Sequence, residues 1–229
     1  MTNAVILAAG MGTRLGRPWP KPLTVLSDGR SIMQQQMDNL RSTFGSELHI
    51  LTVVGFKLEL ILEQFPDVAY AYNEAYDQTN TNRSLLKALL LAPPGGVLWM
   101  NGDVVFDPSI LQRCITIMDA GESFVCVNTA AVGEEEVKYT VDADGFVHDL
   151  SKQVNAPLGE AVGINYVSAA DRDQLILGLR ACDDGDYFER GIEIATQQHG
   201  TRFRPLDISD LFAVEVDFEE DLSRANTHL

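Results

Sequence analysis

The segment from residue 10 to residue 21 places glycines and basic side chains directly after a short apolar run. Glycines allow the backbone to approach a ligand closely and to point N–H groups at phosphate oxygens. Of the 17 basic residues in this acidic chain, three stand in the segment, namely Arg14, Arg17 and Lys21. The chemistry that this pattern predicts is the binding of a phosphate-bearing ligand by backbone amides and cations.

Two familiar phosphate-binding motifs do not account for this segment. In the dinucleotide fingerprint G-x-G-x-x-G, counted from Gly10, the third glycine position holds Leu15, and Gly16 comes one residue late. The Walker A sequence G-x-x-x-x-G-K-[ST] does not occur in the chain. The alternative to a phosphate site is a tight glycine turn with cations on the surface.

Asp103 is a candidate metal ligand because of its place in the sequence. The apolar run 97–100 ends in Asn101-Gly102-Asp103, so a carboxylate follows a strand that is expected to be buried. A hard oxygen ligand at that place can hold Mg²⁺ against a phosphate. Taken alone, an aspartate at a strand end is more often a turn former, so the prediction depends on its surroundings.

The remaining pattern indicates an α/β fold that would bring these residues together. Apolar runs alternate with segments of helical period through the first 130 residues. Loops that follow the carboxyl ends of parallel strands meet at one edge of the sheet, where ligands bind. The expected strands are residues 4–8, 48–54, 68–72, 97–100 and 124–128, and the expected helices are 32–44 capped by Ser31, 57–65, 83–91 and 108–118.

After about residue 130 the pattern becomes that of antiparallel structure. The runs 137–141 and 146–150 flank Asp142-Ala143-Asp144-Gly145, which is a hairpin signal. We therefore expect a doubly wound parallel sheet over about 1–130, joined to an antiparallel lid that shares its core. The other expected strands are 161–167, 203–208 and 211–216, and the other helices are 169–181, 187–199 and 219–225.

The composition excludes two classes of partner. With 17 basic and 33 acidic residues the net charge is −16, which argues against general nucleic-acid binding and against docking on anionic membranes. The three cysteines are widely spaced without a C-x-x-C motif, which favours a reducing compartment and hence a cytoplasmic protein. The apolar run 4–9 is too short for a signal sequence or a membrane span.

The sequence from residue 7 to residue 23 resembles the start of one enzyme family. Nucleotidyltransferases of the sugar-phosphate and cytidylyl type carry L-A-A-G-x-G-x-R-[LM] followed by P-K-[PA]-L. The resemblance implies a Rossmann-like, doubly wound mixed sheet with a small antiparallel lid subdomain. It also implies transfer of a nucleoside monophosphate from a triphosphate to a phosphate-bearing acceptor, with Mg²⁺ as cofactor. The matching residues are Leu7, Ala8, Ala9, Gly10, Gly12, Arg14, Leu15, Pro20, Lys21, Pro22 and Leu23.

The resemblance implies roles for particular residues. Asp103 matches the first metal aspartate of the family, and Asp217 in Glu215-Val216-Asp217 matches the second. Lys152 ends a segment similar to the family's G-x-V-x-x-[IV]-x-[EK]-K strand, whose lysine reaches the acceptor phosphate. The implied catalytic cations are Arg14, Lys21 and Lys152, and the implied nucleotide contacts are Leu7, Ala8, Ala9, Gly10, Met11, Gly12, Thr13, Arg14, Lys21, Asn80, Ser84 and Asp103.

The family's organisation implies three parts within a single domain over 1–229. About 1–130 would form the nucleotide-binding core, and about 131–209 would form the acceptor-side lid with its helices. Residues 210–229 would return to the core as the strand with the second metal ligand, followed by a final helix.

Two features favour the cytidylyl branch and hence CTP as the donor. Only Gly16, Arg17, Pro18 and Trp19 separate Leu15 from Pro20, a short form that resembles inositol-1-phosphate, phosphocholine and phosphonate cytidylyltransferases. The segments 73–76 and 80–85 resemble the phosphocholine type, which implies that Asn80 and Ser84 lie near the cytosine or ribose. The alternatives are an Asn-rich turn with a helix cap and, for the whole chain, a sugar-1-phosphate nucleotidyltransferase that uses UTP or dTTP.

Two further segments bear on the acceptor. Gly159-Glu160 and Tyr187-Phe188-Glu189 resemble segments of the same small-alcohol cytidylyl group, which implies that Glu160 and Glu189 join Lys152 on the acceptor side. Carboxylates beside a lysine suit an acceptor with an ammonium at one end and phosphorus at the other. We expect 2-aminoethylphosphonate first and phosphocholine second, with no nucleic-acid or membrane partner, and leave a homodimer open.

Overall fold

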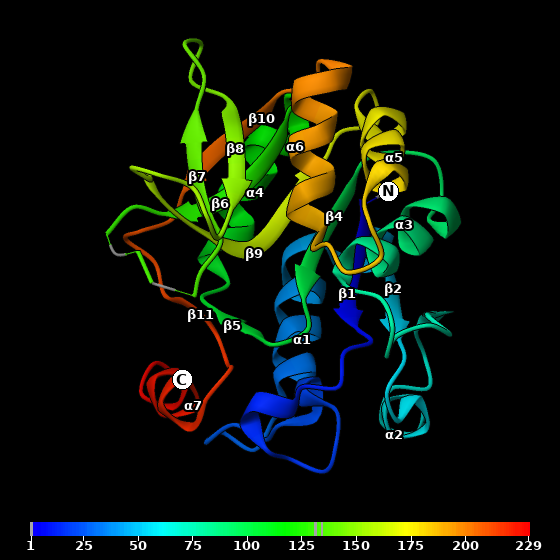
Figure 1. Ribbon diagram of the computed structural model, residues 1–229. Coiled ribbons are helices and arrows are strands. Elements are labelled where there is room, and N and C mark those ends of the chain that lie inside the picture. The colour runs from blue at the N-terminus through cyan, green and yellow to red at the C-terminus, as the bar shows by residue number, and fades with distance from the viewer. Residues whose placement is uncertain (1, 131, 134) are drawn as a thin grey trace.

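The computed structural model describes residues 2–130, 132–133 and 135–229, without the side chain of Thr13. In this part of the chain nine strands form one mixed sheet, which helices cover on both faces (Figure 1). The order along the main path is β10-β6-β9-β4-β1-β2-β3. The three layers follow from the sequence, since strands that are apolar on both sides must be buried on both faces.

The first half of the sheet is parallel. In β1 (Thr2–Ala8), all but the first residue are buried, and Leu7 lies between Val53 and Asn101 of its two neighbours. The neighbouring strands are β2 (Leu48–Val54), β3 (Ala69–Tyr72) and β4 (Val97–Asn101). Their carboxyl ends lie at the lower edge of the sheet in Figure 1.

The second half of the sheet mixes both directions. Strand β9 (Gly159–Val167) runs antiparallel between β4 and β6 (Ser123–Asn128), and β10 (Phe203–Asp207) is parallel to β6 at the edge. The antiparallel hairpin of β7 (Lys138–Val141) and β8 (Val147–Ser151) joins the sheet through β9.

Helices from different parts of the chain form the two outer layers. One face of the sheet packs against α3 (Thr81–Leu91), α5 (Arg172–Ala181) and α6 (Phe188–His199). The other face packs against α1 (Ile32–Phe44), α2 (Leu58–Gln64) and α4 (Ser109–Asp119). Short 3₁₀ turns lie at η1 (Thr13–Leu15), η2 (Lys21–Leu23) and η3 (Gly45–Glu47).

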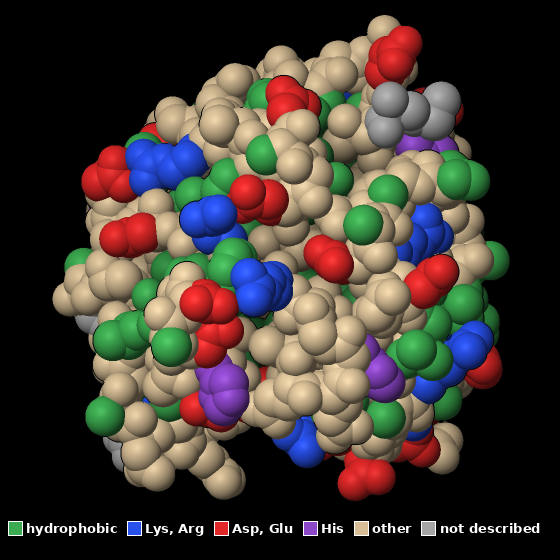
Figure 2. All heavy atoms as spheres, turned by 90° about the horizontal axis from the view of Figure 1, so that it is seen from above, with side chains coloured by type: hydrophobic (Ala, Val, Ile, Leu, Met, Phe, Trp, Pro, Cys, Tyr) green, Lys and Arg blue, Asp and Glu red, His purple; other side chains and the backbone are tan. Residues whose placement is uncertain are grey.

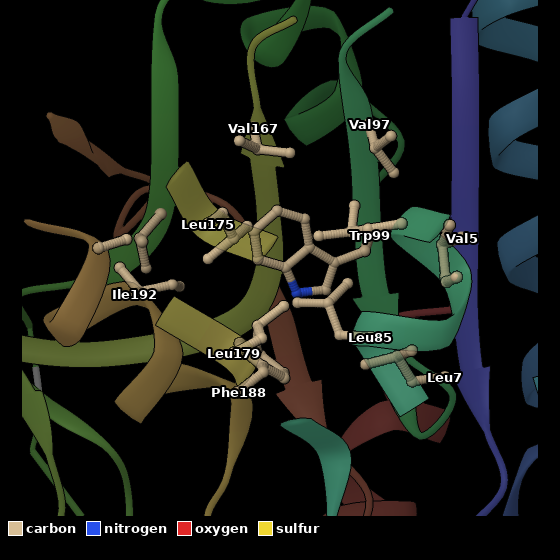
Figure 3. Close-up of a cluster of buried hydrophobic side chains, with 14 of the residues drawn as sticks. Val5, Leu7, Leu85, Val97, Trp99, Val167, Leu175, Leu179, Phe188 and Ile192 are labelled. Atoms are coloured by element: carbon tan, nitrogen blue, oxygen red, sulfur yellow. The ribbon is translucent and has the colours of Figure 1, made fainter. Parts of the chain in front are cut away.

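Trp99 is at the centre of the core between the sheet and α5 and α6 (Figure 3). Its side chain is fully buried and meets the ring of Phe188 edge to face, with ring centroids 5.7 Å apart. Helices α5 and α6 touch closely, because a Cβ added to Gly178 would lie 2.3 Å from the carbonyl oxygen of Gly191. The packing thus fixes the start of α6, where Glu189 stands.

Amide side chains of α1 hold the turn that carries Asp103. The amide of Gln36 donates to the carbonyl oxygens of Asn101 and Val104 at 2.9 and 2.8 Å. Gln35 and Asn39 both donate to the carbonyl oxygen of Phe106. These bonds lock the short strand β5 (Val104–Phe106) beneath α1, and Asp103 stands between β4 and β5.

The carboxyl-terminal segment returns to the same edge. Strand β11 (Ala213–Glu215) pairs antiparallel with β5, which sets Glu215 opposite Val104. Helix α7 (Glu219–Asn226) follows and packs on Leu15 and Leu26 through Leu222 and Ala225. Because of this return, the last part of the sequence lies beside the loop that follows the first strand (Figure 1).

The expected mixed α/β fold is confirmed, and most elements lie within a few residues of their expected positions. The cap of α1 is also confirmed, since the Ser31 side chain accepts the N–H of Gln34. The structure differs from the expectation of a parallel sheet over 1–130. Strand β9 separates β4 from β6 because it pairs antiparallel with both, and its long run of buried residues suits a strand in the middle of the sheet. The short strand β5 was not expected.

Two further findings concern the charges on the surface and the length and polarity of the helices. On the face seen from above in Figure 2, acidic and basic side chains are interspersed rather than gathered in separate areas. In the described part of the chain, every helix is too short or too polar to span a membrane.

Candidate active site

A cavity of about 310 Å³ lies at the carboxyl ends of β1 and β4. Its walls come from segments that are distant in sequence: the loop after β1, the turn before β5, the start of α3, the residues before β7, the start of α6 and the end of β11. This is the edge at which α/β sheets bind ligands. The glycine, polar and charged residues of the wall include Gly10, Gly12, Arg14, Lys21, Asn80, Asn101, Asp103, Glu135, Glu136, Lys152, Tyr187, Glu189, Glu215 and Asp217.

The loop after β1 forms one wall of the cavity. Gly12 has a φ of +58°, and a Cβ there would lie 3.0 Å from the Cβ of Lys21, so a side chain at this position would be both strained and crowded. Gly102 donates its N–H to the carbonyl oxygen of Leu7 at 2.9 Å, which ties the loop to the turn at Asp103. The glycines therefore bring the loop against both Lys21 and the aspartate turn.

Four charged side chains of the cavity wall meet beside this loop. The ammonium of Lys21 donates to Asp103 Oδ2 at 2.9 Å and to Asp217 Oδ1 at 2.5 Å. The guanidinium of Arg14 donates to the other oxygen of Asp217 at 2.5 Å. Burial alone would lower the pKa of Lys21, but the attraction of Asp103 and Asp217 outweighs it and raises the pKa above its usual value. Lys21 is therefore a firmly charged ammonium between two carboxylates.

The donor set fits a divalent cation in part. Asp103 and Asp217 offer hard carboxylate oxygens that converge on one atom, the Nζ of Lys21, which is the arrangement a Mg²⁺ ion with few protein ligands would use. Among the described residues there is no group of three or more Asp, Glu, His or Cys side chains that could hold a metal ion. A metal here would thus take its other ligands from phosphate or water.

The other charged side chains of the cavity wall are mostly carboxylates. Lys152 lies over the ring of Tyr187, with its Nζ 5.3 Å from the ring centroid, and 4.0 Å from the carboxylate of Glu135. Glu136 and Glu189 line the same region. One lysine and one aromatic ring thus stand among several acids, which is the environment of a molecule that carries charges of both signs.

Glu189 is the unusual member of this group. Its side chain is buried, with 7% of the residue exposed, and its Oε2 has no hydrogen-bond partner. Burial raises the pKa of Glu189 to about 7. Buried charges in proteins are normally paired, so a buried carboxylate on a cavity wall with one oxygen left without a partner is a place for a cation from a ligand.

Two neighbours of Glu189 have shifted pKa values for similar reasons. Burial raises the pKa of Glu215 well above its usual range, and the charge of Asp103 adds to the effect, although Asn101 Nδ2 donates to its carboxylate at 3.0 Å. Burial and the nearby Glu160 raise the pKa of Glu136. The region therefore resists further negative charge and favours a cation.

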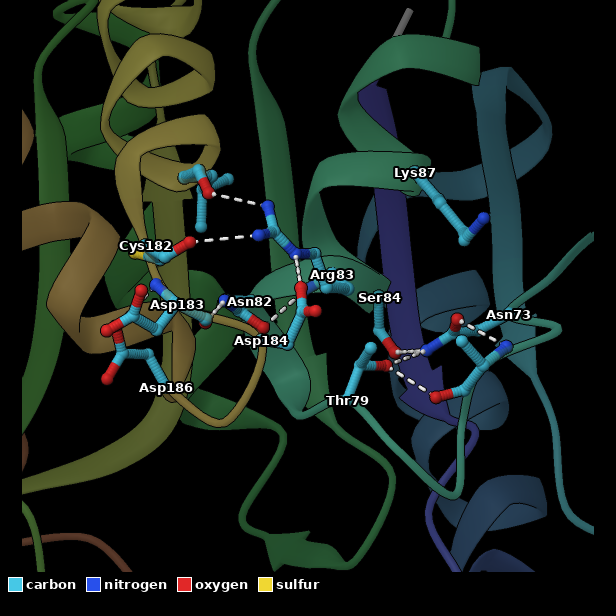
Figure 4. Close-up of polar contacts among 12 residues, drawn as sticks. Asn73, Thr79, Asn82, Arg83, Ser84, Lys87, Cys182, Asp183, Asp184 and Asp186 are labelled. Atoms are coloured by element: carbon cyan, nitrogen blue, oxygen red, sulfur yellow. Dashed lines mark hydrogen bonds and ion pairs between the residues drawn. The ribbon is translucent and has the colours of Figure 1, made fainter.

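Asn80 lines the cavity, whereas Ser84 does not. Asn80 Oδ1 accepts the N–H of Thr81, and this contact caps α3, so the helix-cap alternative holds for the residue while it also faces the cavity. Ser84 is buried one turn further along α3, where its hydroxyl accepts a hydrogen bond from Asn73 Nδ2 at 3.1 Å (Figure 4). The helix thus turns Ser84 toward the Asn73 loop, and its place near the cytosine or ribose stays a prediction.

Glu160 also lies outside the main cavity. It accepts the N–H of Gly133 at 2.7 Å and lines an adjacent smaller cavity of about 80 Å³. The two cavities are neighbours, since Glu136, Ala161 and Glu215 line both of them. The carboxylate of Glu160 holds the loop before β7, and its contact with the acceptor stays a prediction.

The other expected nucleotide contacts divide into two sets. Leu7, Ala8 and Gly10 line the cavity. Ala9 is buried, and its carbonyl oxygen accepts the N–H of Phe56. Met11 is exposed and is not among the residues of the cavity wall, and the side chain of Thr13 lies outside the described part of the structure.

The cavity wall includes residues to which sequence reasoning gave no role, among them Asn101, Glu135, Glu136 and Glu215. A signal existed for Glu215, because a strand that ends in Glu-Val-Asp turns its first and third side chains to the same side. For Glu135 and Glu136 the sequence offered only a run of acids, which is typical of an exposed loop.

Comparison with known proteins gives the family to which this chain belongs. The chain matches the MobA-like NTP transferase domain over residues 4–170 and belongs to that family. It is thus a nucleotidyltransferase-type domain, as the motif at residues 7–23 predicted.

One similar protein is the CMP-5'-(3-aminopropyl)phosphonate synthase of Streptomyces rubellomurinus, which is 29% identical over 246 residues. The match covers 98% of this chain and 38% of the relative, so the chain spans well under half of that protein's length.

Two solved structures share the fold. The inositol-1-phosphate CTP transferase of T. maritima superposes with a TM-score of 0.77 at 16% identity, covering 98% of this chain and 96% of the other. The CTP:phosphocholine cytidylyltransferase of Streptococcus pneumoniae (LicC) has a TM-score of 0.73 at 18% identity, covering 100% and 99%. At these identities the likeness concerns the fold.

Proposed function

We propose that this chain transfers CMP from CTP to a small phosphonate or phospho-alcohol that carries an amine, and releases pyrophosphate. The observation that carries the proposal is that one cavity brings together two groups of charged side chains. The first is the glycine loop with Arg14, Lys21 and two convergent aspartates, and the second is Lys152 with the buried Glu189, whose Oε2 has no hydrogen-bond partner.

The first group of side chains suits a nucleoside triphosphate. Arg14 and Lys21 supply positive charge to the phosphates, and the amides of the loop offer further donors. A divalent cation held by Asp103 and Asp217 would neutralise charge on the transferring phosphate. An acceptor oxygen attacks the α-phosphorus, the bond from that phosphorus to the bridging oxygen breaks, and pyrophosphate leaves with the electron pair. Since the attacking oxygen is already ionised near neutral pH, the chain needs to orient it rather than deprotonate it.

The second group of side chains supports an acceptor that carries charges of both signs. Lys152 is the cation available for a phosphonate or phosphate group, while Glu189, Glu136 and Glu135 would repel that group and attract an ammonium. The relative from Streptomyces rubellomurinus bears the name of a synthase whose product joins CMP to an aminopropyl phosphonate. We therefore place aminoalkylphosphonates first, with 2-aminoethylphosphonate as the first choice among them, and phosphocholine second.

A matched set of acceptors tests the proposal. Purified protein is incubated with CTP, Mg²⁺ and 2-aminoethylphosphonate, 3-aminopropylphosphonate, phosphocholine or ethylphosphonate, and pyrophosphate release is followed. Loss of the amine removes one charge-assisted contact of about 1.5–3 kcal/mol, so ethylphosphonate should have a kcat/KM about tenfold to a hundredfold lower.

Two results would contradict the proposal. Equal rates with 2-aminoethylphosphonate and ethylphosphonate would remove the role of the amine. Faster reaction of glucose-1-phosphate with UTP or dTTP in the same assay would favour the alternative, a sugar-1-phosphate nucleotidyltransferase.

A further inference from the structure

We propose that the ammonium of Lys21 acts as a built-in substitute for the metal ion, so that free divalent cations and Lys21 compete for Asp103 and Asp217 until a nucleotide draws the lysine away. The inference rests on the proposed function, in that it takes the ligand of the cavity to be a metal-bound triphosphate. It concerns how the site is kept neutral before that ligand arrives.

The contacts of Lys21 leave no room for a second cation between the aspartates. Its Nζ is 2.9 Å from Asp103 Oδ2 and 2.5 Å from Asp217 Oδ1, and only 10% of the lysine side chain is exposed. A Mg²⁺ ion binds oxygen at about 2.0–2.1 Å, so it cannot share these two oxygens with the ammonium. Arg14 takes the second oxygen of Asp217 at 2.5 Å, which adds a further competitor.

The charges of the group balance without any ligand. Arg14 and Lys21 carry two positive charges, and Asp103 and Asp217 carry two negative charges. A metal ion that arrives alone would have to displace an ammonium and leave it without a partner inside the cavity, which is unfavourable. A triphosphate with its metal supplies a partner for every group, because the phosphates take the two cations and the metal takes the two carboxylates.

The backbone of Lys21 is fixed, so the exchange falls to its side chain. Lys21 stands between Pro20 and Pro22 at the start of the turn η2, and the N–H of Thr24 donates to its carbonyl oxygen at 2.9 Å. The Cβ of Lys21 also lies close to Gly12. A flexible stem on a fixed backbone can turn from the aspartates to phosphates over the glycine loop without refolding of the site.

Competition between Lys21 and the metal predicts an effect on metal binding opposite in sign to that of a lysine that only holds the nucleotide. If Lys21 only assisted ligand binding, its removal would weaken every ligand. If it replaces the metal, its removal weakens nucleotide binding but strengthens the binding of the free metal. It should also reduce the coupling between metal and nucleotide, since the lysine is the group that links the two events.

The probe is Mn²⁺ in the absence of nucleotide, measured by the electron paramagnetic resonance signal of the free ion. We compare wild type, Lys21→Met, the double variant Lys21→Met with Asp103→Asn, and Lys87→Met. Lys87 pairs with Glu74 on the surface and serves as the matched lysine control. Repetition with α,β-methylene-CTP, which does not react, measures the coupling.

The proposal predicts that Lys21→Met binds Mn²⁺ about tenfold to a hundredfold more tightly than wild type, as expected for loss of a competing charge-assisted contact. Lys87→Met should bind as wild type does, and the Asp103→Asn change should abolish the gain. The nucleotide analogue should raise Mn²⁺ affinity more in wild type than in Lys21→Met. Equal or weaker Mn²⁺ binding by folded Lys21→Met overturns the proposal.

A second measurement uses the wild-type protein in case the variant does not fold. Acetic anhydride acylates free amines, and peptide mass spectrometry reports the rate at Lys21 relative to Lys87. At constant ionic strength, rising Mn²⁺ should speed acylation of Lys21 in a saturable way, and an unchanged rate while Mn²⁺ binds refutes the competition. Neither measurement uses an acceptor or turnover, so a failure of the proposed reaction would be seen separately in the acceptor assay.

Discussion

Replacement of Glu189 by glutamine should make the protein more stable at alkaline pH. The carboxylate is buried on the cavity wall, its Oε2 has no partner, and burial raises its pKa to about 7 from the usual 4.5. In the unfolded chain the same carboxyl ionises near its usual pKa. Between these two values the folded protein binds more protons than the unfolded chain, so its stability falls as pH rises.

The magnitude follows from the two pKa values. A pKa difference of one corresponds to about 1.4 kcal/mol, so the full penalty above pH 7 is about 3 kcal/mol. At about pH 5.5 the penalty is smaller, about 1.4 kcal/mol. Glu189→Gln removes the ionisation altogether. The free energy of unfolding of Glu189→Gln, relative to that of wild type, should therefore rise by about 2 kcal/mol between about pH 5.5 and about pH 8.

The assay is denaturation by urea at both pH values, without ligand, for wild type and Glu189→Gln. Glu193 provides the control, because it stands one turn later in α6 and is also 7% exposed. Its carboxylate accepts the N–H of Leu150 at 2.8 Å and pairs with Arg190 at 3.1 Å. Glu193→Gln loses the ion pair and should show no gain at the higher pH.

A difference between Glu189→Gln and wild type that does not change with pH would refute the reasoning, since it would mean that Glu189 is paired or solvated. An amine-bearing acceptor should also stabilise wild type more than Glu189→Gln at about pH 8, because its ammonium would pair with the carboxylate. Equal stabilisation of both proteins would separate the unpaired charge from acceptor binding.

Two further predictions concern the metal site and the core. Asp103→Asn and Asp217→Asn should each move the Mg²⁺ activation curve of pyrophosphate release to higher concentration, because an amide is a poorer ligand for a hard cation; a variant that titrates like wild type is not altered at a metal ligand. Gly178→Ala should lower the free energy of unfolding by several kcal/mol, on the order of an overpacked core, since the new Cβ would lie 2.3 Å from the Gly191 carbonyl oxygen, and a melting temperature like that of wild type would contradict this.

The sequence by itself determined most of the elements and the part of the cavity formed by the glycine loop and Asp103. The glycine loop follows an apolar strand, and Asp103 follows another, so a parallel α/β sheet brings both to one edge. Local signals also set the Ser31 cap and the hairpin around Gly145, because caps and turns depend on residues a few positions apart.

Only the tertiary structure decided which charges meet and which remain unpaired. Lys21 contacts Asp217, which is 196 positions away, because β11 pairs with β5 beside the aspartate turn. Asn80 and Ser84 stand four residues apart on one helix start, yet one faces the cavity and the other bonds to Asn73. Glu160 and Glu189 also differ, since Oε2 of Glu160 accepts the N–H of Gly133 and Oε2 of Glu189 has no partner. Sequence spacing gives neither result, because a side chain's partners are set by the packing of distant elements.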